Sequence, residues 1–581
     1  MTNKNKLVRY PELSEAMKAV KHYFIYAGLF SAAVNILMLA PIIYMLQVYD
    51  RVLGSGSLPT LTMLTLLLVA LLSAAGGFEW VRSMILIRAS NRIEKNLRQR
   101  VFDASFKLTL LSGGQQANSQ PNADLTALRQ FLTGNGLFAF FDAPWFPIYV
   151  GVMFLFHPWF GVAAIFAGIV MVVLAYTNEI VTSKALQEAN AGANWVNGQI
   201  SRCLNNSEVI AAMGMTADIR KRQDQGFDKV LKLQTHASQK AAILVNISKS
   251  FRMIMQSLLL GLGALQTLRQ EISPGMMIAG SLLLGRALAP IDLLVGTWKG
   301  FSIARAQYER LGELLERIPA NEETMALPAP KGNLSVEKIM VVPPGSKNIV
   351  VKGVTMQLSA GEVLGIIGPS ASGKSSLARA LLGIWPTQSG KVRLDNADIA
   401  SWDRIKLGPH IGYLPQDIEL FDGSISENIC RFGEIDPEKI VAASMLAGVH
   451  EMILRLPKGY DTIIGGSGGI LSAGQRQRIG LARAAYDNPC LLVLDEPNSN
   501  LDEQGERELV EAIKRIKSAG CTVIVITHRT MVLSVVDKML VMQEGTMKMF
   551  GPRDAVLQKL MPKPSNTNAQ TPAENSMSTT N

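Results

Sequence analysis

The segment Gly368–Ser375 combines residue types that bind phosphate. It contains Gly-Pro-Ser-Ala-Ser-Gly-Lys-Ser and fits the pattern G-x-x-x-x-G-K-[ST]. An apolar run at 363–367 predicts a buried strand before the segment, and 376–382 predicts the start of a helix after it. Glycines let backbone N–H groups surround phosphate oxygens, and a helix N-terminus adds partial positive charge. The predicted nucleotide-binding residues here are Gly368, Pro369, Ser370, Ala371, Ser372, Gly373, Lys374, Ser375 and Ser376.

Two carboxylates farther along the chain suit phosphoryl transfer. Asp495 and Glu496 follow the apolar run 490–494, which predicts a strand that ends in these two side chains. Lys374 can reach the β- and γ-phosphates, and the Ser375 hydroxyl can ligate Mg²⁺. Asp495 would bind the metal directly or through water, and Glu496 would act as general base or orient the attacking water. An apolar run that ends in Asp-Glu is a weak signal when it stands alone.

The segment Leu471–Arg478 is the most specific one in the chain. It contains Leu-Ser-Ala-Gly-Gln-Arg-Gln-Arg and resembles the LSGGQ signature of ABC (ATP-binding cassette) ATPases, with Ala473 where glycine is usual. A Ser-Gly pair at a helix N-terminus makes a second phosphate cradle. An ordinary helix N-cap would explain Ser472 but not the whole string. The resemblance implies that Ser472, Gly474 and Gln475 contact ATP.

Three further positions match this family. Gln416, in Tyr-Leu-Pro-Gln, resembles the Q-loop glutamine, which contacts Mg²⁺ and senses the transmembrane part. Ser499–Asp502 resembles the D-loop. His528, in Ile-Thr-His-Arg after the apolar strand 522–526, resembles the switch histidine that contacts the γ-phosphate. The resemblance thus implies Glu496 and His528 as catalytic residues. The implied Mg²⁺ ligands are Ser375, Gln416 and Asp495.

The resemblance also implies a homodimer with two ATP sites. In this family two cassettes pack head to tail, and the signature of one completes the phosphate site of the other. ATP would close the dimer and hydrolysis would reopen it, so that the membrane helices alternate the side to which they give access.

The adenine site departs from the family pattern. ABC exporters usually place an aromatic residue upstream of the phosphate loop, where it stacks on adenine. The corresponding stretch here is Met-Val-Val-Pro-Pro-Gly, with Val342 or Pro343 in that place. We therefore expect an aliphatic surface against adenine and looser nucleotide affinity or selectivity.

Composition points to a membrane protein of several domains. The chain has 581 residues, too many for one core. The mean hydropathy of +0.19 is high, and only 18% of residues are charged. The net charge of +10 is spread along the chain, which argues against a nucleic-acid partner. The four cysteines stand far apart, which suggests reduced thiols in the cytoplasm rather than disulfides or zinc ligands.

Hydropathy predicts six membrane spans with both termini in the cytoplasm. The expected spans are 23–48, 58–79, 137–156, 160–176, 241–268 and 276–298. A short turn at 49–57 joins the first two, and the basic residues from Arg82 to Arg100 mark a cytoplasmic end. The charged residues Asp142, Arg252 and Arg286 lie in or near spans and either face a cavity or partner or lie at helix ends.

The expected fold is thus an α-helical, six-span ABC exporter transmembrane domain followed by an α/β P-loop NTPase domain. We place a cytoplasmic segment at 1–22, the transmembrane domain with long cytoplasmic loops at 23–317 and a Pro/Ala-rich linker at 318–330. The ATP-binding domain follows at 331–562, and 563–581 is expected to be a disordered tail.

Several strings over roughly residues 15 to 560 resemble type I secretion ABC transporters of the PrtD kind. They include Phe-Asp-Ala-Pro-Trp-Phe-Pro at 141–147 and Leu-Asp-Glu-Pro-Asn-Ser-Asn-Leu-Asp at 494–502. Such transporters lie in the inner membrane of Gram-negative bacteria and work with a periplasmic adaptor (membrane fusion protein) and a TolC-like outer-membrane channel. Their cargo is an unfolded polypeptide with an uncleaved C-terminal signal. Because about 22 residues precede the first span, we expect no N-terminal peptidase-like domain.

Two alternative functions compete with protein export. A lipid or multidrug exporter has the same spans and short outside loops. A polypeptide path should instead be wide and polar, with Asp142, Arg252 and Arg286 as candidate lining residues. The second alternative is a cassette protein that does not transport, either a channel subunit or a soluble ATPase. The six spans argue against a soluble ATPase, and Glu496 argues against a channel subunit that has lost catalysis.

Overall fold

The computed structural model describes residues 10–114, 119–320, 327–465 and 471–560. The chain divides into two compact units, and each is considered by itself. The helical unit holds the described residues up to Leu108 and from 119 to Ala320, and the α/β unit holds the other described residues. The expected tail at 563–581 and residues 321–326 of the expected linker lie outside the described residues.

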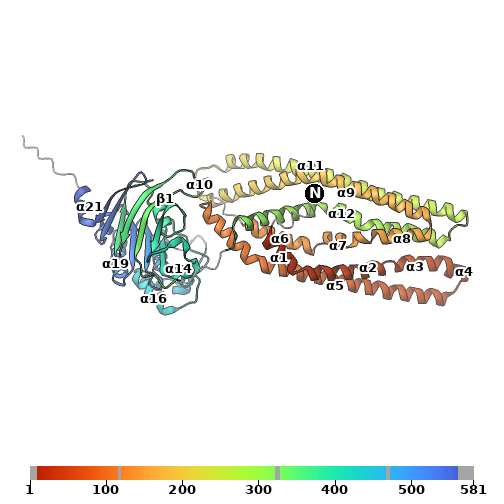
Figure 1. Ribbon diagram of the computed structural model, residues 1–581, viewed down its shortest axis with the longest axis horizontal. Coiled ribbons are helices and arrows are strands. Elements are labelled where there is room, and N and C mark those ends of the chain that lie inside the picture. The colour runs from red at the N-terminus through yellow and green to blue at the C-terminus, as the bar shows by residue number, and fades with distance from the viewer. Residues whose placement is uncertain (1–9, 115–118, 321–326, 466–470, 561–581) are drawn as a thin grey trace, which may run out of the picture. The chain divides into compact units, whose positions relative to one another are not determined.

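The helical unit is built from long helices, of which α9 and α11 run side by side (Figure 1). Six helical segments in the described part of the chain are long and apolar enough to cross a membrane, which confirms the six-span prediction. In chain order the elements are α1 (Pro11–Ala19), α2 (Lys21–Leu37), α3 (Ala40–Gln47), a π-helical turn (Val48–Val52), α4 (Leu53–Ser55), α5 (Leu58–Leu111), α6 (Gln120–Thr133), α7 (Asn135–Asp142), a 3-10 turn (Ala143–Trp145), α8 (Phe146–Phe156), α9 (Pro158–Asn205), α10 (Ser207–Ala212), α11 (Thr216–Leu268) and α12 (Pro274–Arg317).

Two local features differ from the sequence expectation. The segment 49–57 is mostly helical rather than a simple turn, and it ends at Gly56, whose φ of +67° suits a helix C-terminus. The third span is not one helix, because Ala143–Trp145 interrupts it between α7 and α8. Pro144 lacks a backbone N–H and its ring crowds the preceding turn, which accounts for this break.

Small residues let the membrane helices pack closely. Gly280 on α12 faces the ring of Phe160 on α9, and a Cβ at position 280 would overlap that ring. Gly263 on α11 similarly faces Met277 on α12, where a Cβ would lie 2.8 Å from the Met277 Cγ. Close approach of this kind maximises van der Waals contact between helices in a lipid environment. These contacts position α12 against both of its long neighbours.

Two arginines in the membrane helices of the helical unit are paired with carboxylates. Arg82 on α5 is only 2% exposed, and its Nη1 lies 3.0 Å from Asp142 Oδ1 at the end of α7. Arg252 on α11 lies 3.5 Å from Asp292 on α12. A carboxylate 60 residues away along the chain therefore compensates the buried charge of Arg82.

The α/β unit contains twelve strands and nine α-helices among the described residues. The strands are β1 (Leu334–Val341), β2 (Val351–Leu358), β3 (Val363–Ile367), β4 (Thr387–Leu394), β5 (Ala397–Asp398), β6 (Ile411–Leu414), β7 (Gly423–Ser424), β8 (Ile463–Ile464), β9 (Leu491–Asp495), β10 (Thr522–Ile526), β11 (Lys538–Gln543) and β12 (Thr546–Pro552). The helices are α13 (Lys374–Leu381), α14 (Arg404–Leu407), α15 (Ile425–Ile429), α16 (Pro437–Leu446), α17 (His450–Leu454), α18 (Ala473–Ala485), α19 (Glu503–Ser518), α20 (Thr530–Leu533) and α21 (Arg553–Leu560).

A six-stranded sheet forms the centre of this unit, in the order β12-β11-β3-β10-β9-β6. All neighbours pair in parallel except the edge strand β12. Alternate residues of β9 and β10 enter two different cores, since Leu492 and Val523 pack in one and Val493 and Ile524 in the other. Such strands are buried on both faces, which explains their unbroken apolar sequences.

The parallel register gathers the candidate site at one edge of this sheet. Ile526, the last residue of β10, pairs with Asp495, the last residue of β9, and β3 ends beside them at Ile367. The segments that follow the three strands therefore leave the sheet from the same edge. In open α/β sheets, ligands bind outside the carboxyl ends of the strands.

Candidate functional site

The phosphate loop between β3 and α13 needs its glycines. Gly368 has φ +156° and Gly373 has φ +94°, and a Cβ at Gly368 would overlap the Met542 carbonyl oxygen. Ala371, with φ +62°, also adopts the left-handed region. Helix α13 begins directly after Gly373, so its free N–H groups face the loop. The Ser372 hydroxyl is buried with no partner among the described residues, which leaves a polar atom for a phosphate group.

Lys374 is the cationic group of this loop. Its side chain is buried, and Nζ donates to the carbonyl oxygens of Gly368 at 2.8 Å and Pro369 at 2.9 Å. Burial lowers the pKa of Lys374, and the negative charges of Glu496 and Asp495 partly oppose that shift. These contacts hold the ammonium group across the loop, where the phosphates of a nucleotide would lie.

Asp495 and Ser375 form the metal-binding part of the arrangement. Ser375 Oγ donates to Asp495 Oδ1 at 3.2 Å. Asp495 is 1% exposed, and its Oδ2 has no partner among the described residues. Burial raises the pKa of Asp495, while the Ser375 hydroxyl and the charges of Arg379 and Lys374 lower it. A buried carboxylate oxygen without a partner beside a hydroxyl fits Mg²⁺, which prefers oxygen ligands and uses one or two carboxylates with phosphates.

Glu496 lies directly beyond β9 in an unusual backbone conformation. Its φ is +50°, and its N–H donates to the Ile526 carbonyl at 3.0 Å. The side chain contacts two of the predicted site residues. Gln416 Nε2 donates to Glu496 Oε2 at 3.2 Å, and His528 Nε2 lies 3.5 Å from Oε1. Strained backbone of this kind concentrates at functional sites, where the surrounding contacts hold it in place.

The signature residues begin α18. Ser472 Oγ accepts the Gln475 N–H at 3.2 Å, and Gln475 Oε1 accepts the Ser472 N–H at 2.8 Å, which together form a capping box. Gly474 lies in the first turn and Ala473 is exposed. The Ser472 hydroxyl proton and the next N–H groups stay available to an anion at this helix N-terminus.

The structure thus brings one group of predicted residues together and leaves another apart. Ser375 contacts Asp495, and Gln416 and His528 contact the neighbouring Glu496. Lys374 lies near enough for both carboxylates to affect its pKa. Among the residues that the structure describes, no hydrogen bond or ion pair connects Ser472, Gly474 or Gln475 to the phosphate loop.

Sequence reasoning missed three buried polar residues beside the site. Gln477, Asn498 and Thr527 are each at most 5% exposed, and each hydrogen-bonds to a segment that carries a site residue. A signal for Gln477 was present, because Gln477, Leu481 and Ala484 recur at helical spacing on the buried face of α18. A glutamine in an apolar stripe indicates a buried hydrogen bond.

Comparison with known proteins places both units in one family. Residues 351–499 match the ABC transporter family, and residues 24–289 match the ABC transporter transmembrane region. The fold resembles that of a bacterial Atm1-family ABC exporter with ATP bound, with a TM-score of 0.80, 21% identity, and coverage of 93% of this chain and 97% of the other. The expected fold class is therefore confirmed.

Relatives that match nearly the whole chain indicate which group of ABC transporters it belongs to. The type I secretion system ATP-binding protein PrsD of Rhizobium meliloti is 44% identical over 95% of both chains. The leukotoxin translocation ATP-binding protein LktB of Mannheimia haemolytica is 28% identical over 88% of this chain and 73% of its own length. The cyclolysin secretion/processing ATP-binding protein CyaB of Bordetella pertussis is 27% identical, with coverage of 90% and 74%. This chain is a multi-pass ABC transporter that couples ATP hydrolysis to transport, and it belongs to the type I secretion ATP-binding proteins.

Proposed function

We propose that this protein is the ATPase and permease of a type I secretion system and exports an unfolded polypeptide with an uncleaved C-terminal signal. It would lie in the bacterial inner membrane, with its termini and its ATP-binding domain in the cytoplasm. A periplasmic adaptor and a TolC-like outer-membrane channel would continue the path to the exterior. The observation that carries the proposal is the 44% identity to a type I secretion ATP-binding protein over 95% of both chains.

The proposed hydrolytic roles follow from the contacts in the α/β unit. The phosphate loop and Lys374 bind the phosphates, and Glu496 accepts a proton from the attacking water. Gln416 and His528 hold the two oxygens of the Glu496 carboxylate and orient it. Ser375 and Asp495 would hold Mg²⁺, with Gln416 as a further ligand, and the metal would neutralise charge on the phosphates.

The active form is proposed to be a homodimer. Ser472, Gly474 and Gln475 of one chain would close over the ATP held by the phosphate loop of the other. Support comes from the start of α18, where Ser472 and Ala473 are exposed and available to a second chain. ATP would then join the two chains, and hydrolysis would release them.

The test uses the purified full chain in proteoliposomes. The C-terminal segment of a cargo protein encoded beside this gene is added, and the ATPase rate is compared with that for a scrambled segment of the same composition. We expect the native segment alone to bind and change the rate. If neither segment binds while lipids or drugs strongly stimulate turnover, the protein is a lipid or multidrug exporter and the secretion proposal fails.

A further inference from the structure

Gln477 contacts the segment that follows the catalytic strand at two points. Its Nε2 donates to the Glu496 carbonyl oxygen at 3.4 Å, and its Oε1 accepts the Asn500 N–H at 3.2 Å. The side chain is 2% exposed, so water does not compete for either contact. One amide group on α18 therefore fixes both the residue that carries the candidate base and the D-loop (Ser499–Asp502).

The same segment is held from its other side by the end of β10. Thr527 Oγ1 donates to Asn498 Oδ1 at 3.1 Å, and both side chains are buried. Thr527 Oγ1 also accepts the Arg529 N–H at 3.1 Å, which fixes the backbone on both sides of His528. The segment from Glu496 to Asn500 is thus hydrogen-bonded to α18 and to Thr527, which directly precedes His528.

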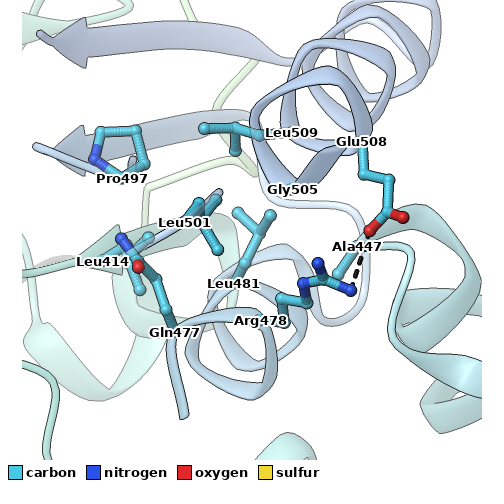
Figure 2. Close-up of a pocket in the computed structure, with 10 residues that line it drawn as sticks. All are labelled: Leu414, Ala447, Gln477, Arg478, Leu481, Pro497, Leu501, Gly505, Glu508 and Leu509. Carbon is cyan, nitrogen blue, oxygen red and sulfur yellow. Dashed lines mark ion pairs between the residues drawn. The ribbon is translucent and has the colours of Figure 1, made fainter. Parts of the chain in front are cut away.

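Close packing limits how far α18 can move relative to the D-loop. A Cβ at Gly474 would lie 3.0 Å from the Asn500 carbonyl oxygen, so the first turn of α18 is packed against the D-loop. Figure 2 shows a small pocket between α18 and α19, with Gln477 on one side and the ion pair of Arg478 and Glu508 on the other. Its volume of about 10 Å³ is too small for a ligand. Because Gly474 lies close to Asn500 and Gln477 hydrogen-bonds to Glu496 and Asn500, a shift of α18 would displace the D-loop or break the Gln477 contacts.

We propose that Gln477 is a positioning residue that couples the two ATP sites of the dimer. The inference rests on the proposed function, in which the N-terminus of α18 contacts ATP bound to the other chain. Contact with that phosphate would fix the position of α18. Through its two hydrogen bonds, Gln477 would then fix the Glu496 backbone and the D-loop of its own chain. ATP at one site would thereby set the geometry of the base at the other.

The left-handed backbone of Glu496 makes this residue sensitive to such a connection. With φ +50°, the conformation persists only while neighbouring contacts hold it, and the Gln477 contact is one of them. Gln477 does not touch nucleotide in this proposal, and its effect passes through Glu496. Loss of the amide should therefore alter communication between sites more than ATP binding.

The experiment measures ATPase rate against ATP concentration in proteoliposomes for the unmodified protein and for Gln477→Met. Methionine keeps the length of the side chain but neither hydrogen bond. We expect a Hill coefficient above one in the unmodified protein and about 1 in the variant, with ATP affinity changed less than about 2-fold. An unchanged Hill coefficient in Gln477→Met, or a coefficient of one in the unmodified protein, overturns the inference.

Three further variants distinguish lost coupling from misfolding and from failure to dimerise. Gln477→Glu keeps an acceptor for Asn500 but cannot donate to Glu496, so it should also lose cooperativity even if the methionine variant fails to fold. Gln504→Met is the matched control, because Gln504 is exposed on α19 and donates to Glu508 on the same helix. Glu496→Gln tests the underlying dimer. If it forms no ATP-dependent dimer, the proposed function fails, whereas if it does and Gln477→Met stays cooperative, the coupling inference fails by itself.

Discussion

The imidazole Nε2 of His528 lies 3.5 Å from Glu496 Oε1, while Gln416 donates to the other carboxylate oxygen at 3.2 Å. The carboxylate therefore contacts two side chains that follow different strands, β6 and β10. A general base must be oriented as well as basic, since a misplaced group loses most of its effect. These contacts make Glu496 the strongest candidate for the base.

Replacing Glu496 with glutamine should abolish steady ATP hydrolysis and leave ATP binding intact. Glutamine keeps the shape and can still contact Gln416 and His528, but it cannot accept the proton, so we expect the rate to fall by about 10²–10⁴-fold. ATP-bound dimers should accumulate and can be measured by size-exclusion chromatography. Glu503→Gln is the control, because Glu503 is exposed at the start of α19. Undiminished turnover in Glu496→Gln would refute the base assignment.

Much of this site could be predicted from short stretches of sequence. The phosphate loop depends on glycines with positive φ and on a helix that starts at once, and both are local properties. The position of Asp495 and Glu496 follows from a buried strand in which four apolar residues precede Asp495. That these strand ends lie side by side follows from the parallel order of the sheet, which the fold class implies.

The features that could not be predicted depend on contacts between residues that are far apart in the sequence. The pairing of Arg82 with Asp142 is one such feature, because the two residues lie 60 positions apart in the sequence. The sequence shows Gln477 only as a polar residue on an apolar helix face. Its hydrogen-bond partners depend on how α18 packs against the segment that follows β9. A proline marks the break at Ala143–Trp145 in the sequence, but many membrane helices accommodate proline without interruption.

Gly368→Ala should prevent ATP binding without unfolding the protein. A Cβ would overlap the Met542 carbonyl oxygen and would require a φ that L-residues rarely adopt, so the loop must move out of its phosphate-binding shape. Binding of a fluorescent ATP analogue should fall by at least about 10-fold. Gly408→Ala is the control, because its Cβ would enter open space. Equal affinities of the two variants would contradict the role given to the loop.

Asp495→Asn should stabilise the nucleotide-free protein at neutral pH. Burial raises the pKa of Asp495 above its value in the unfolded chain, so the folded state binds this proton more tightly. This tighter proton binding stabilises the folded state fully at pH values below the unfolded pKa. The stabilisation is lost as the pH rises through the folded pKa, where the buried carboxyl ionises. Asparagine stays neutral, so the variant should gain a few degrees in Tm relative to the unmodified protein at pH 7.5 but not at pH 4. A difference in Tm that is the same at both pH values would contradict the cause.

Cys490 and Cys521 should resist alkylation in the folded protein. Burial raises the pKa of the Cys490 thiol to about 11 and that of Cys521 to about 12. At pH 8 the reactive thiolate is then on the order of 0.1% of Cys490 or less. Mass spectrometry after iodoacetamide treatment should find both thiols unmodified in the native protein and modified in denaturant. Rapid labelling of either in the native state would show that this core opens readily.

The buried pair of Arg82 and Asp142 should be needed for the stability of the helical unit. Asp142 also accepts hydrogen bonds from Ser31 and Asn35 on α2, so the carboxylate joins α2, α5 and α7. Removing one partner leaves an uncompensated buried charge, which costs about 3–5 kcal/mol, whereas removing both charges is often neutral. We therefore expect Arg82→Met and Asp142→Leu each to lower Tm in detergent.

The double variant Arg82→Met/Asp142→Leu separates a charge effect from loss of packing. Restored stability relative to both single variants would show that the penalty comes from the unpaired charge. Arg98→Met is the matched control on the same helix, because Arg98 is 76% exposed and lies 3.7 Å from Glu94, and such surface pairs contribute only about 0–1 kcal/mol. If the double variant is as unstable as the worse single variant, the three helices depend on the hydrogen bonds and shape of these side chains. If both single variants are as stable as Arg98→Met, the pair does not hold the helices together.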